Sequence, residues 1–380
     1  MPKKKKSQSK IRTEFRKNHQ GRTRDTNLTR KYEQDLLGDT TSRERVSGKG
    51  ELTRHRTVVG QVSATGSDGL AVELQFDDPS IVSGRVLRVH GLNCIVRSED
   101  GSQHSCAVRG LLKSLATEQR HVVAAGDQVY FRPEGQSQGI ILAVKERHGV
   151  LSRTSKGKRH IIVSNVDLLL IIASAAQPDL KPHLIDRFLV TAEQAGLEPV
   201  IVINKVDLID PVELQPVIGV YAQMGYRTLM VSAAKGWGVA TLRELVHGRQ
   251  SVVTGQSGVG KSSLLNAIQT GLALRVQQVS QENMKGKHTT TTAELIPLAA
   301  GGYLVDTPGI RQLELWDVSP PEVCGLFRDI RPYVSHCRFP DCTHIHEVDC
   351  AVLDAVADGR IDPRRYNSYV HLIEDPGASF

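Results

Sequence analysis

The chain has 380 residues, of which 39% are hydrophobic and 33 are glycine, and this length is enough for two or three domains with buried cores. No apolar stretch reaches the roughly 18 residues that a membrane helix needs, and the basic N-terminus "MPKKKKSQSK" has no apolar region behind it, so we expect neither a membrane span nor a secretory signal. Six cysteines are too few for a disulfide scaffold, which favours a reducing compartment, the cytoplasm.

Positive charge is concentrated near the N-terminus. Residues 1–50 contain 15 Lys and Arg against 6 Asp and Glu, whereas residues 51–380 have a net charge of −2. This polar composition predicts a basic disordered tail over residues 1–45. The tail either solubilises the protein or binds nucleic acid, because Lys and Arg that neutralise phosphates release counterions.

Residues 46–152 are predicted to form a small β-barrel. Short segments with alternating apolar positions follow one another, among them "SGRVLRVHGLNCIVRSEDG", "QHSCAVRG" and "DQVYFRPEG". About five short strands in about 70 residues favour an OB-fold, although an SH3-like barrel has the same periodicity.

Residues 155–315 predict an α/β domain with a parallel sheet. Continuous apolar strands at "IIVSNVDLLLIIASA", "EPVIVINKVDL" and "YRTLMVSAAKG" alternate with helices such as "HLIDRFLVTAEQAG", which is expected to end at Gly196. Strands that are buried on both faces belong to parallel sheets, whose loops gather at the carboxyl ends of the strands.

A phosphate-binding loop, "GQSGVGKS", lies between a predicted strand and a predicted helix. Its glycines allow backbone N–H groups to converge on phosphate oxygens, and the helix N-terminus adds its positive dipole end. Lys261 would reach the β- and γ-phosphates, and the Ser262 hydroxyl would bind Mg²⁺. The predicted nucleotide-binding residues here are Gly255, Gln256, Ser257, Gly258, Val259, Gly260, Lys261, Ser262 and Ser263.

Two further loops are predicted to read the base. "NKVD" comprises Asn204, Lys205, Val206 and Asp207. The two oxygens of a carboxylate at Asp207 match the N1–H and N2–H groups of guanine, which adenine lacks. Ser232 and Ala233 lie in the loop expected to meet guanine O6, and Asn204 would brace the loops.

The loops occur in a permuted order. In ordinary GTPases the phosphate-binding loop precedes the base-reading loops, whereas here "NKVD" comes first and "DTPG" follows at residues 306–309. Asp306 is expected to hold Mg²⁺, and the N–H of Gly309 to sense the γ-phosphate. A parallel sheet allows such a circular permutation, because joining the usual termini and cutting elsewhere leaves every strand in place.

The water-orienting glutamine of Ras-like enzymes has no counterpart here, since Ile310 follows Gly309. We therefore expect a low intrinsic rate of hydrolysis. The segment "KGKHTTTT" contains two candidates for completing the site. One threonine of residues 289–292, of which we choose Thr290, is expected to bind Mg²⁺ and the γ-phosphate, and His288 would order the attacking water. The alternatives for His288 are an ordinary loop residue or an RNA contact.

A cysteine cluster in residues 318–380 predicts a zinc-binding domain that is mostly helical. Cys337, Cys342, His344 and Cys350 have the spacing C-x4-C-x-H-x5-C, and three thiolates with one imidazole close a tetrahedral structural Zn²⁺ shell. His346 is an alternative ligand by spacing. The C-x2-4-C…H-x3-5-H pattern of a DNA-binding finger is absent.

Together these motifs resemble the bacterial small-subunit-dependent GTPases, the RsgA family, over roughly residues 45–375. The resemblance implies an OB-fold, a circularly permuted GTPase domain and a zinc domain that act together on the 30S ribosomal subunit and its 16S rRNA late in subunit maturation. It also implies that the subunit stimulates GTP hydrolysis. We expect the protein to be a monomer in the cytoplasm. Carried over by position, it favours His344 over His346 as a zinc ligand and assigns catalysis to His288. An assembly factor in which GTP only gates RNA affinity is the alternative.

Overall fold

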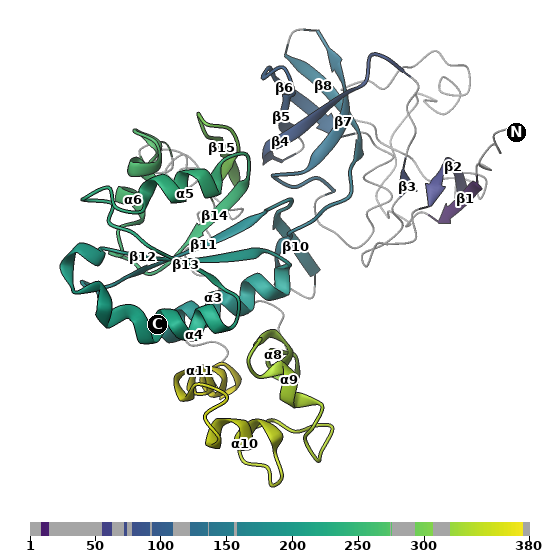
Figure 1. The fold of residues 1–380 in the computed structure, drawn as a ribbon. Helices are drawn as coiled ribbons and strands as arrows, with labels where there is room; N and C mark the ends of the chain where they lie inside the picture. The colour runs from purple at the N-terminus through teal and green to yellow at the C-terminus, as the bar shows by residue number, and fades with distance from the viewer. Residues whose placement is uncertain are drawn as a thin grey trace, which may run out of the picture. The chain divides into compact units, whose positions relative to one another are not determined.

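The structure is a computed structural model with two compact units. It describes residues 9–14, 55–62, 72–73, 78–91, 93–108, 122–135, 137–155, 158–273, 275, 293–306 and 320–374. The first unit is Met1–Arg147 with Ser155–Ile161, and the second is His148–Thr154 with Ile162–Phe380 (Figure 1). Across the described ranges, no helix combines the length and the hydropathy needed to cross a membrane.

Five strands of the first unit close into a barrel. They are β4 (Val82–His90), β5 (Asn93–Ser98), β6 (Gln103–Val108), β7 (Gln128–Glu134) and β8 (Gln138–Val144). The pairing order is β4-β5-β6-β8-β7, and β4 also pairs with β7. Only β6 and β8 run parallel. A parallel pair between the third and fifth strands of a closed barrel is the OB-fold connectivity, so the structure decides between the two barrels that the periodicity allowed.

The first unit also contains a small antiparallel sheet, β1 (Ser9–Glu14), β2 (His55–Val62) and β3 (Val72–Glu73). β1 lies within the range expected to be a disordered tail. Its backbone pairs with β2 from Ser9 opposite Gly60 to Glu14 opposite His55. Pairing with a strand distant in sequence is a tertiary effect, which the local composition of the tail does not predict.

The second unit is built on a central sheet of six strands. They are β11 (Leu168–Ser174), β12 (Glu198–Asn204), β13 (Arg227–Met230), β14 (Gln250–Thr254), β15 (Glu294–Pro297) and β16 (Tyr303–Asp306). Their order is β13-β12-β11-β14-β16-β15, and every neighbouring pair is parallel except β15 and β16. Every residue of β11 is buried, as expected for a strand covered on both faces. Two further strands, β9 (Leu151–Ser155) and β10 (Lys158–Val163), form a separate two-stranded sheet.

The strand order reveals the permutation. β14, which leads into the phosphate-binding loop, is central and lies between β11 and β16. The three strands on one side of it precede it in the chain, and the two on the other side follow it. The sheet is continuous although the loop-bearing strand is fourth in sequence, so the predicted circular permutation is confirmed.

Helices cover both faces of this sheet. α3 (Pro182–Ala195) and α4 (Gln215–Gln223) lie on one face, and α5 (Val239–Val246) and α6 (Lys261–Ile268) on the other (Figure 1). α3 ends at Gly196, as predicted, and the N–H of Gly196 donates to the carbonyl oxygens of Ala192 and Glu193. Two 3₁₀ turns, η2 (Val206–Leu208) and η3 (Pro211–Leu214), connect β12 to α4.

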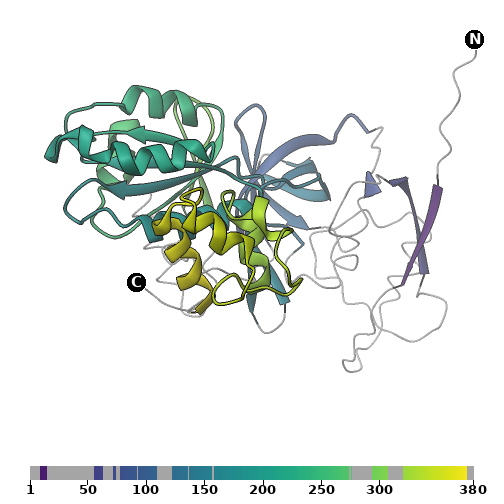
Figure 2. The same ribbon diagram turned by 60° about the horizontal axis from the view of Figure 1, so that its bottom comes forward.

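The C-terminal segment is helical and belongs to the same unit. It comprises α8 (Pro320–Leu326), α9 (Arg331–Val334), α10 (Ala351–Ala357) and α11 (Pro363–Glu374). α11 and α8 pack against α3, and both views place the C-terminal helices on that side of the unit (Figure 1 and Figure 2). Val190 of α3 shares one apolar cluster with Phe327, Ile330 and Tyr369. Residues 318–380, predicted as a separate domain, are therefore joined to the α/β domain by a common core.

Candidate nucleotide-binding site and metal centre

The predicted phosphate-binding loop connects β14 to the N-terminus of α6 and requires glycine at two positions. Gly255 has φ +140° and Gly260 has φ +89°, both in the region that residues with a Cβ rarely adopt. A Cβ on Gly255 would lie 2.1 Å from the carbonyl oxygen of Ile172, and one on Gly260 would lie 2.4 Å from Asn204 Nδ2. The loop is therefore held against β11 and the "NKVD" segment.

Lys261 and the serines after it occupy the first turn of α6. Lys261 Nζ donates to the carbonyl oxygens of Gly255 at 2.7 Å and Gln256 at 2.6 Å, so the ammonium lies within the curve of the loop. Ser262 and Ser263 are exposed at the helix N-terminus. Backbone N–H groups, a helix dipole and an ammonium at one point form an anion site.

Asn204 joins the three nucleotide loops. Its side chain is buried; Nδ2 donates to the carbonyl oxygen of Val259 at 2.9 Å, and Oδ1 accepts from the N–H of Ala233 at 3.1 Å. One amide thus holds the phosphate-binding loop on one side and the Ser232–Ala233 loop on the other. The bracing expected of this residue is present as two hydrogen bonds.

Lys205 and Asp207 follow Asn204 at the carboxyl end of β12. Lys205 adopts a left-handed conformation with φ +62°, and its Nζ donates to the carbonyl oxygens of Gly258, at 2.8 Å, and Gln177. Asp207 is half-buried in η2, whereas Val206 is buried and its N–H donates to Val231 O at 3.3 Å. Val206 is a core residue of η2, and Asp207, the next residue, has a carboxylate that a base could contact.

The Ser232–Ala233 loop is a closed turn. Ser232 is fully buried, its N–H donates to Trp237 O at 3.0 Å, and its Oγ accepts from the N–H of Lys235, also at 3.0 Å. These bonds fix the backbone at Ala233, whose N–H binds Asn204. The loop lies beside "NKVD" because β12 and β13 are parallel neighbours.

Gln177 is a site residue that the sequence did not reveal. It lies between β11 and α3 with φ +52°, and its carbonyl oxygen accepts from Lys205 Nζ. Because the interaction uses a backbone carbonyl, no side-chain pattern announces it; the dipeptide Gln177–Pro178 indicates a turn and nothing more.

Some of the predicted site residues fall outside the described residues: His288, Thr290, Gly309 and Ile310. Asp306 is the last residue of β16, and its backbone pairs with Glu294. β16 is a parallel neighbour of β14, so Asp306 lies on the strand next to the one that carries the phosphate-binding loop.

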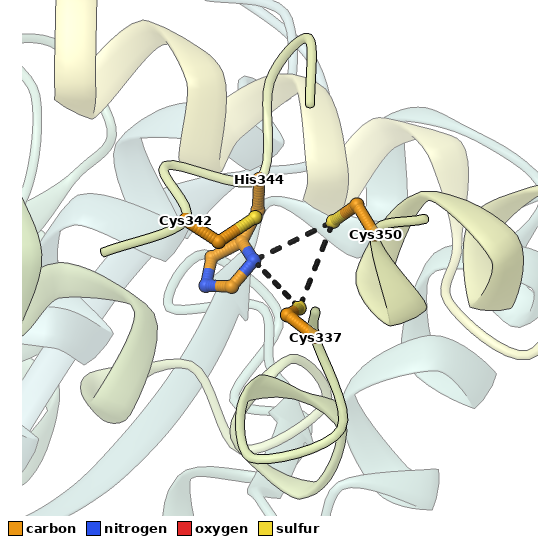
Figure 3. A group of neighbouring side chains, drawn as sticks. All are labelled: Cys337, Cys342, His344 and Cys350. Atoms are coloured by element: carbon orange, nitrogen blue, oxygen red, sulfur yellow. Dashed lines mark hydrogen bonds between the residues drawn. The ribbon is translucent and has the colours of Figure 1, made fainter. Parts of the chain in front are cut away.

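The C-terminal segment brings four predicted metal ligands together. One ligand atom from each of Cys337, Cys342, His344 and Cys350 lies within 4.8 Å of every other, and Figure 3 shows the side chains turned toward one another. His344 Nδ1 is 3.3 Å from Cys337 Sγ and 3.5 Å from Cys350 Sγ, and the two sulfurs are 3.8 Å apart. His346, the alternative ligand, is not in this group; its N–H donates to the Glu347 carboxylate at 3.2 Å.

These distances fit a zinc ion. With Zn–S of about 2.3 Å and Zn–N of about 2.0 Å, a tetrahedral shell separates two sulfurs by about 3.8 Å and a sulfur from a nitrogen by about 3.5 Å. The three separations among Cys337, His344 and Cys350 are close to these values, and the Cys342 sulfur lies within 4.8 Å of the other ligand atoms. Burial raises the pKa of the Cys342 thiol to about 12 and also raises the pKa of the Cys350 thiol. A bound cation would lower both pKa values, because it stabilises the thiolates.

Hydrogen bonds shape the loop that carries the histidine. The Glu347 carboxylate accepts from the N–H groups of Thr343 at 2.7 Å and Ile345 at 3.0 Å. Burial acts to raise the pKa of Glu347, but these bonds outweigh it and hold the pKa well below its usual range. Tyr366 and Tyr369 of α11 donate to His344 O at 2.9 Å and Thr343 O at 2.8 Å, which ties the loop to the helix.

Comparison with known proteins identifies the family. A model of the family described as RsgA GTPase matches residues 144–316. The small ribosomal subunit biogenesis GTPase RsgA of Pseudomonas aeruginosa is 40% identical over 295 residues, which cover 77% of this chain and 84% of that protein. The chain belongs to the RsgA GTPase family. The protein of the same name from Gemmatimonas aurantiaca is 41% identical over 285 residues, 74% of this chain and 92% of that protein.

Solved structures of two relatives agree with this assignment. YjeQ from Thermotoga maritima is 34% identical with a TM-score of 0.64, and the match covers 79% of this chain and 100% of that one. YloQ, described as a circularly permuted GTPase, is 27% identical with a TM-score of 0.60 and covers 81% and 100%. The resemblance inferred from the motifs is confirmed, and as a member of the RsgA GTPase family the protein hydrolyses GTP.

Proposed function

We propose that this GTPase binds the small (30S) ribosomal subunit through its 16S rRNA, turns GTP over faster when bound, and assists late maturation of that subunit as a cytoplasmic monomer. The observation that carries the proposal is the junction at Asn204. It holds a phosphate-binding loop and a base-reading loop together in a chain whose relatives are named small ribosomal subunit biogenesis GTPases. The basic residues 1–50 add a polyanion-binding tail.

The nucleotide loops divide the work of binding GTP. Backbone N–H groups of residues 255–260 would hold the phosphates, and the Lys261 ammonium would exchange its two carbonyl partners for phosphate oxygens. The Asp207 carboxylate would accept from the N1–H and N2–H groups of guanine, and the Ser232–Ala233 loop would meet O6. When Mg²⁺ is bound with GTP it offsets phosphate charge, and Ser262, Thr290 and Asp306 would hold it.

Hydrolysis by this chain needs a group that orients water. Ile310 lies where Ras-like enzymes have glutamine and has no polar atom to offer. We assign this task to His288, which lies outside the described residues. The four ligands of the C-terminal cluster leave no coordination position for substrate, so a Zn²⁺ ion there would be structural.

The decisive experiment measures GTP turnover by the full-length protein with and without purified 30S subunits at two salt concentrations. We expect a slow basal rate that subunits raise many-fold, and a smaller rise at high salt because salt weakens contacts to phosphates. Subunits that bind only in the presence of GTP but leave turnover unchanged would refute activation. That result would instead support an assembly factor in which GTP gates affinity for RNA.

A further inference from the structure

One face of α3 is turned toward the C-terminal segment. Asp186, Val190 and Glu193 are spaced four and three residues apart, which places them on the same side of a helix. Each has a partner in that segment: Asp186 pairs with Arg365, Val190 lies in its apolar cluster, and Glu193 pairs with Arg328.

The centre of this contact is a buried charge cluster. Arg365 of α11 has a relative exposure of 2% and Asp186 of 0%, and Arg365 Nη1 lies 2.6 Å from Asp186 Oδ1. The other edge of the guanidinium binds both carboxylate oxygens of Asp329, at 3.0 and 3.1 Å. The Tyr221 hydroxyl of α4 donates to Asp186 Oδ1 at 2.8 Å. One arginine therefore joins α11 and the turn after α8 to α3, and through Tyr221 to α4.

A second, more exposed tie reaches the same two helices. Arg328 Nε lies 2.6 Å from Glu193 Oε1 near the C-terminal end of α3, and its Nη1 donates to Met224 O, just beyond α4, at 3.3 Å. Its guanidinium also lies over the Tyr226 ring, 4.2 Å from the centroid. Two separate arginines thus resist sliding of the C-terminal segment along α3.

The two helices held in this way, α3 and α4, each follow a loop on the side of the site where the base is predicted to bind. α3 begins directly after the loop that contains Gln177, whose carbonyl oxygen binds Lys205, and α4 begins after η2 and η3, which follow Lys205. α3 has 14 residues and a length of about 21 Å. Asp186 is the fifth residue of α3, about 6 Å along the axis from the first, so a shift at Asp186 reaches the start of the helix and the loop before it, because packed elements move as units.

We propose that Asp186 and Arg365 are a positioning pair: through α3 they fix the loop that holds Lys205, so that the C-terminal segment controls how long a guanine nucleotide stays bound. This inference rests on the proposed function in one respect, the assignment of Asn204–Asp207 as the guanine loop. In the part of the chain that the structure describes, the side chains of the pair are hydrogen-bonded to each other and to Tyr221 and Asp329, which lie outside the nucleotide loops. Their effect is on nucleotide release and on KM, and the chemical step is left nearly unchanged.

The test compares two adjacent arginines in the full-length, metal-loaded protein. Arg365→Lys keeps the charge but cannot bind Asp186 and Asp329 together, since lysine lacks the planar fork. Arg364→Lys is the matched control, because Arg364 pairs with Asp362, two residues away in its own segment. We expect Arg365→Lys to release fluorescently labelled GDP at least about fivefold faster, the lower end of a typical coupling energy. The variant should also have a higher KM for GTP, while its kcat stays within about twofold of the wild-type value. Arg364→Lys should match the wild type.

The outcomes separate this inference from the proposed function. An unchanged GDP release rate in a folded Arg365→Lys variant that retains its metal overturns the positioning role, because a merely structural pair would lower the melting temperature alone. If that variant does not fold, Glu193→Gln weakens only the more exposed tie, and we expect at least about twofold faster release; an unchanged rate again overturns the inference. Failure of the wild type to bind GDP would refute both proposals. Absence of stimulation by subunits, with the two arginine variants still different, would refute only the proposed function.

Discussion

Replacing Asn204 with alanine should remove the side-chain link between the phosphate-binding loop and the Ser232–Ala233 loop. The amide of Asn204 is buried and donates to Val259 O at 2.9 Å while it accepts from the N–H of Ala233 at 3.1 Å. Alanine makes neither bond and leaves both backbone groups without this partner.

The size of the effect follows from these two bonds. Each contributes about 0.5–1.5 kcal/mol net, so their loss costs about 1–3 kcal/mol. Because both bonds exist before nucleotide binds, part of the cost lowers the stability of the free protein. The rest lowers affinity, because binding must then order loops that are no longer prepared. Since 1.4 kcal/mol corresponds to tenfold, GTP affinity should fall by at most about 150-fold and by at least severalfold.

The assay is a titration with fluorescent GTP alongside thermal unfolding of the nucleotide-free protein, and Asn165→Ala is the control. Asn165 is equally buried, and its Oδ1 accepts from the N–H of His148 at 3.2 Å, ahead of β11 and away from the nucleotide loops. Asn165 also has φ +56°, so alanine at this position adds backbone strain to the loss of the hydrogen bond. We expect both variants to lose stability and only Asn204→Ala to lose affinity. Equal loss of affinity in the two, or wild-type affinity in Asn204→Ala, would refute the bracing role.

Four further predictions follow from the site. Asp207→Asn should weaken GTP binding by at least about 100-fold and shift preference toward xanthosine nucleotides, since the amide donates where the carboxylate accepted; competition binding with the two nucleotides measures this. Gly260→Ala, whose Cβ would lie 2.4 Å from Asn204 Nδ2, should abolish GTP binding while circular dichroism stays near wild type, and retained affinity would contradict the close approach. His288→Ala should preserve GTP affinity and flatten stimulation by 30S subunits; an unchanged stimulated rate would remove its catalytic assignment. Chelation of the metal should lower the melting temperature of the C-terminal segment, because Cys350 lies in its apolar cluster, and hydrogen exchange in α10 and α11 reports it; unchanged protection would show that the ion is dispensable for folding.

The local sequence determined the parts of this protein whose chemistry lies within a few consecutive residues. The phosphate-binding loop, "NKVD" and the cysteine spacing each fix a backbone shape or a ligand set over a short stretch, so the chain alone predicted them and their permuted order. The end of α3 at Gly196 was predictable for the same reason, since glycine readily adopts the conformation that ends a helix.

The tertiary structure decided everything that depends on residues far apart in sequence. Periodicity gives the strands of a barrel but not their order, so only the parallel pairing of β6 with β8 distinguished the OB-fold. The carbonyl of Gln177 carries no side-chain signal, and Arg365 looks like any charged residue of a surface helix until packing places it against Asp186, 179 positions away. Long-range pairing and burial are set by how the elements pack, and a local pattern contains no information about them.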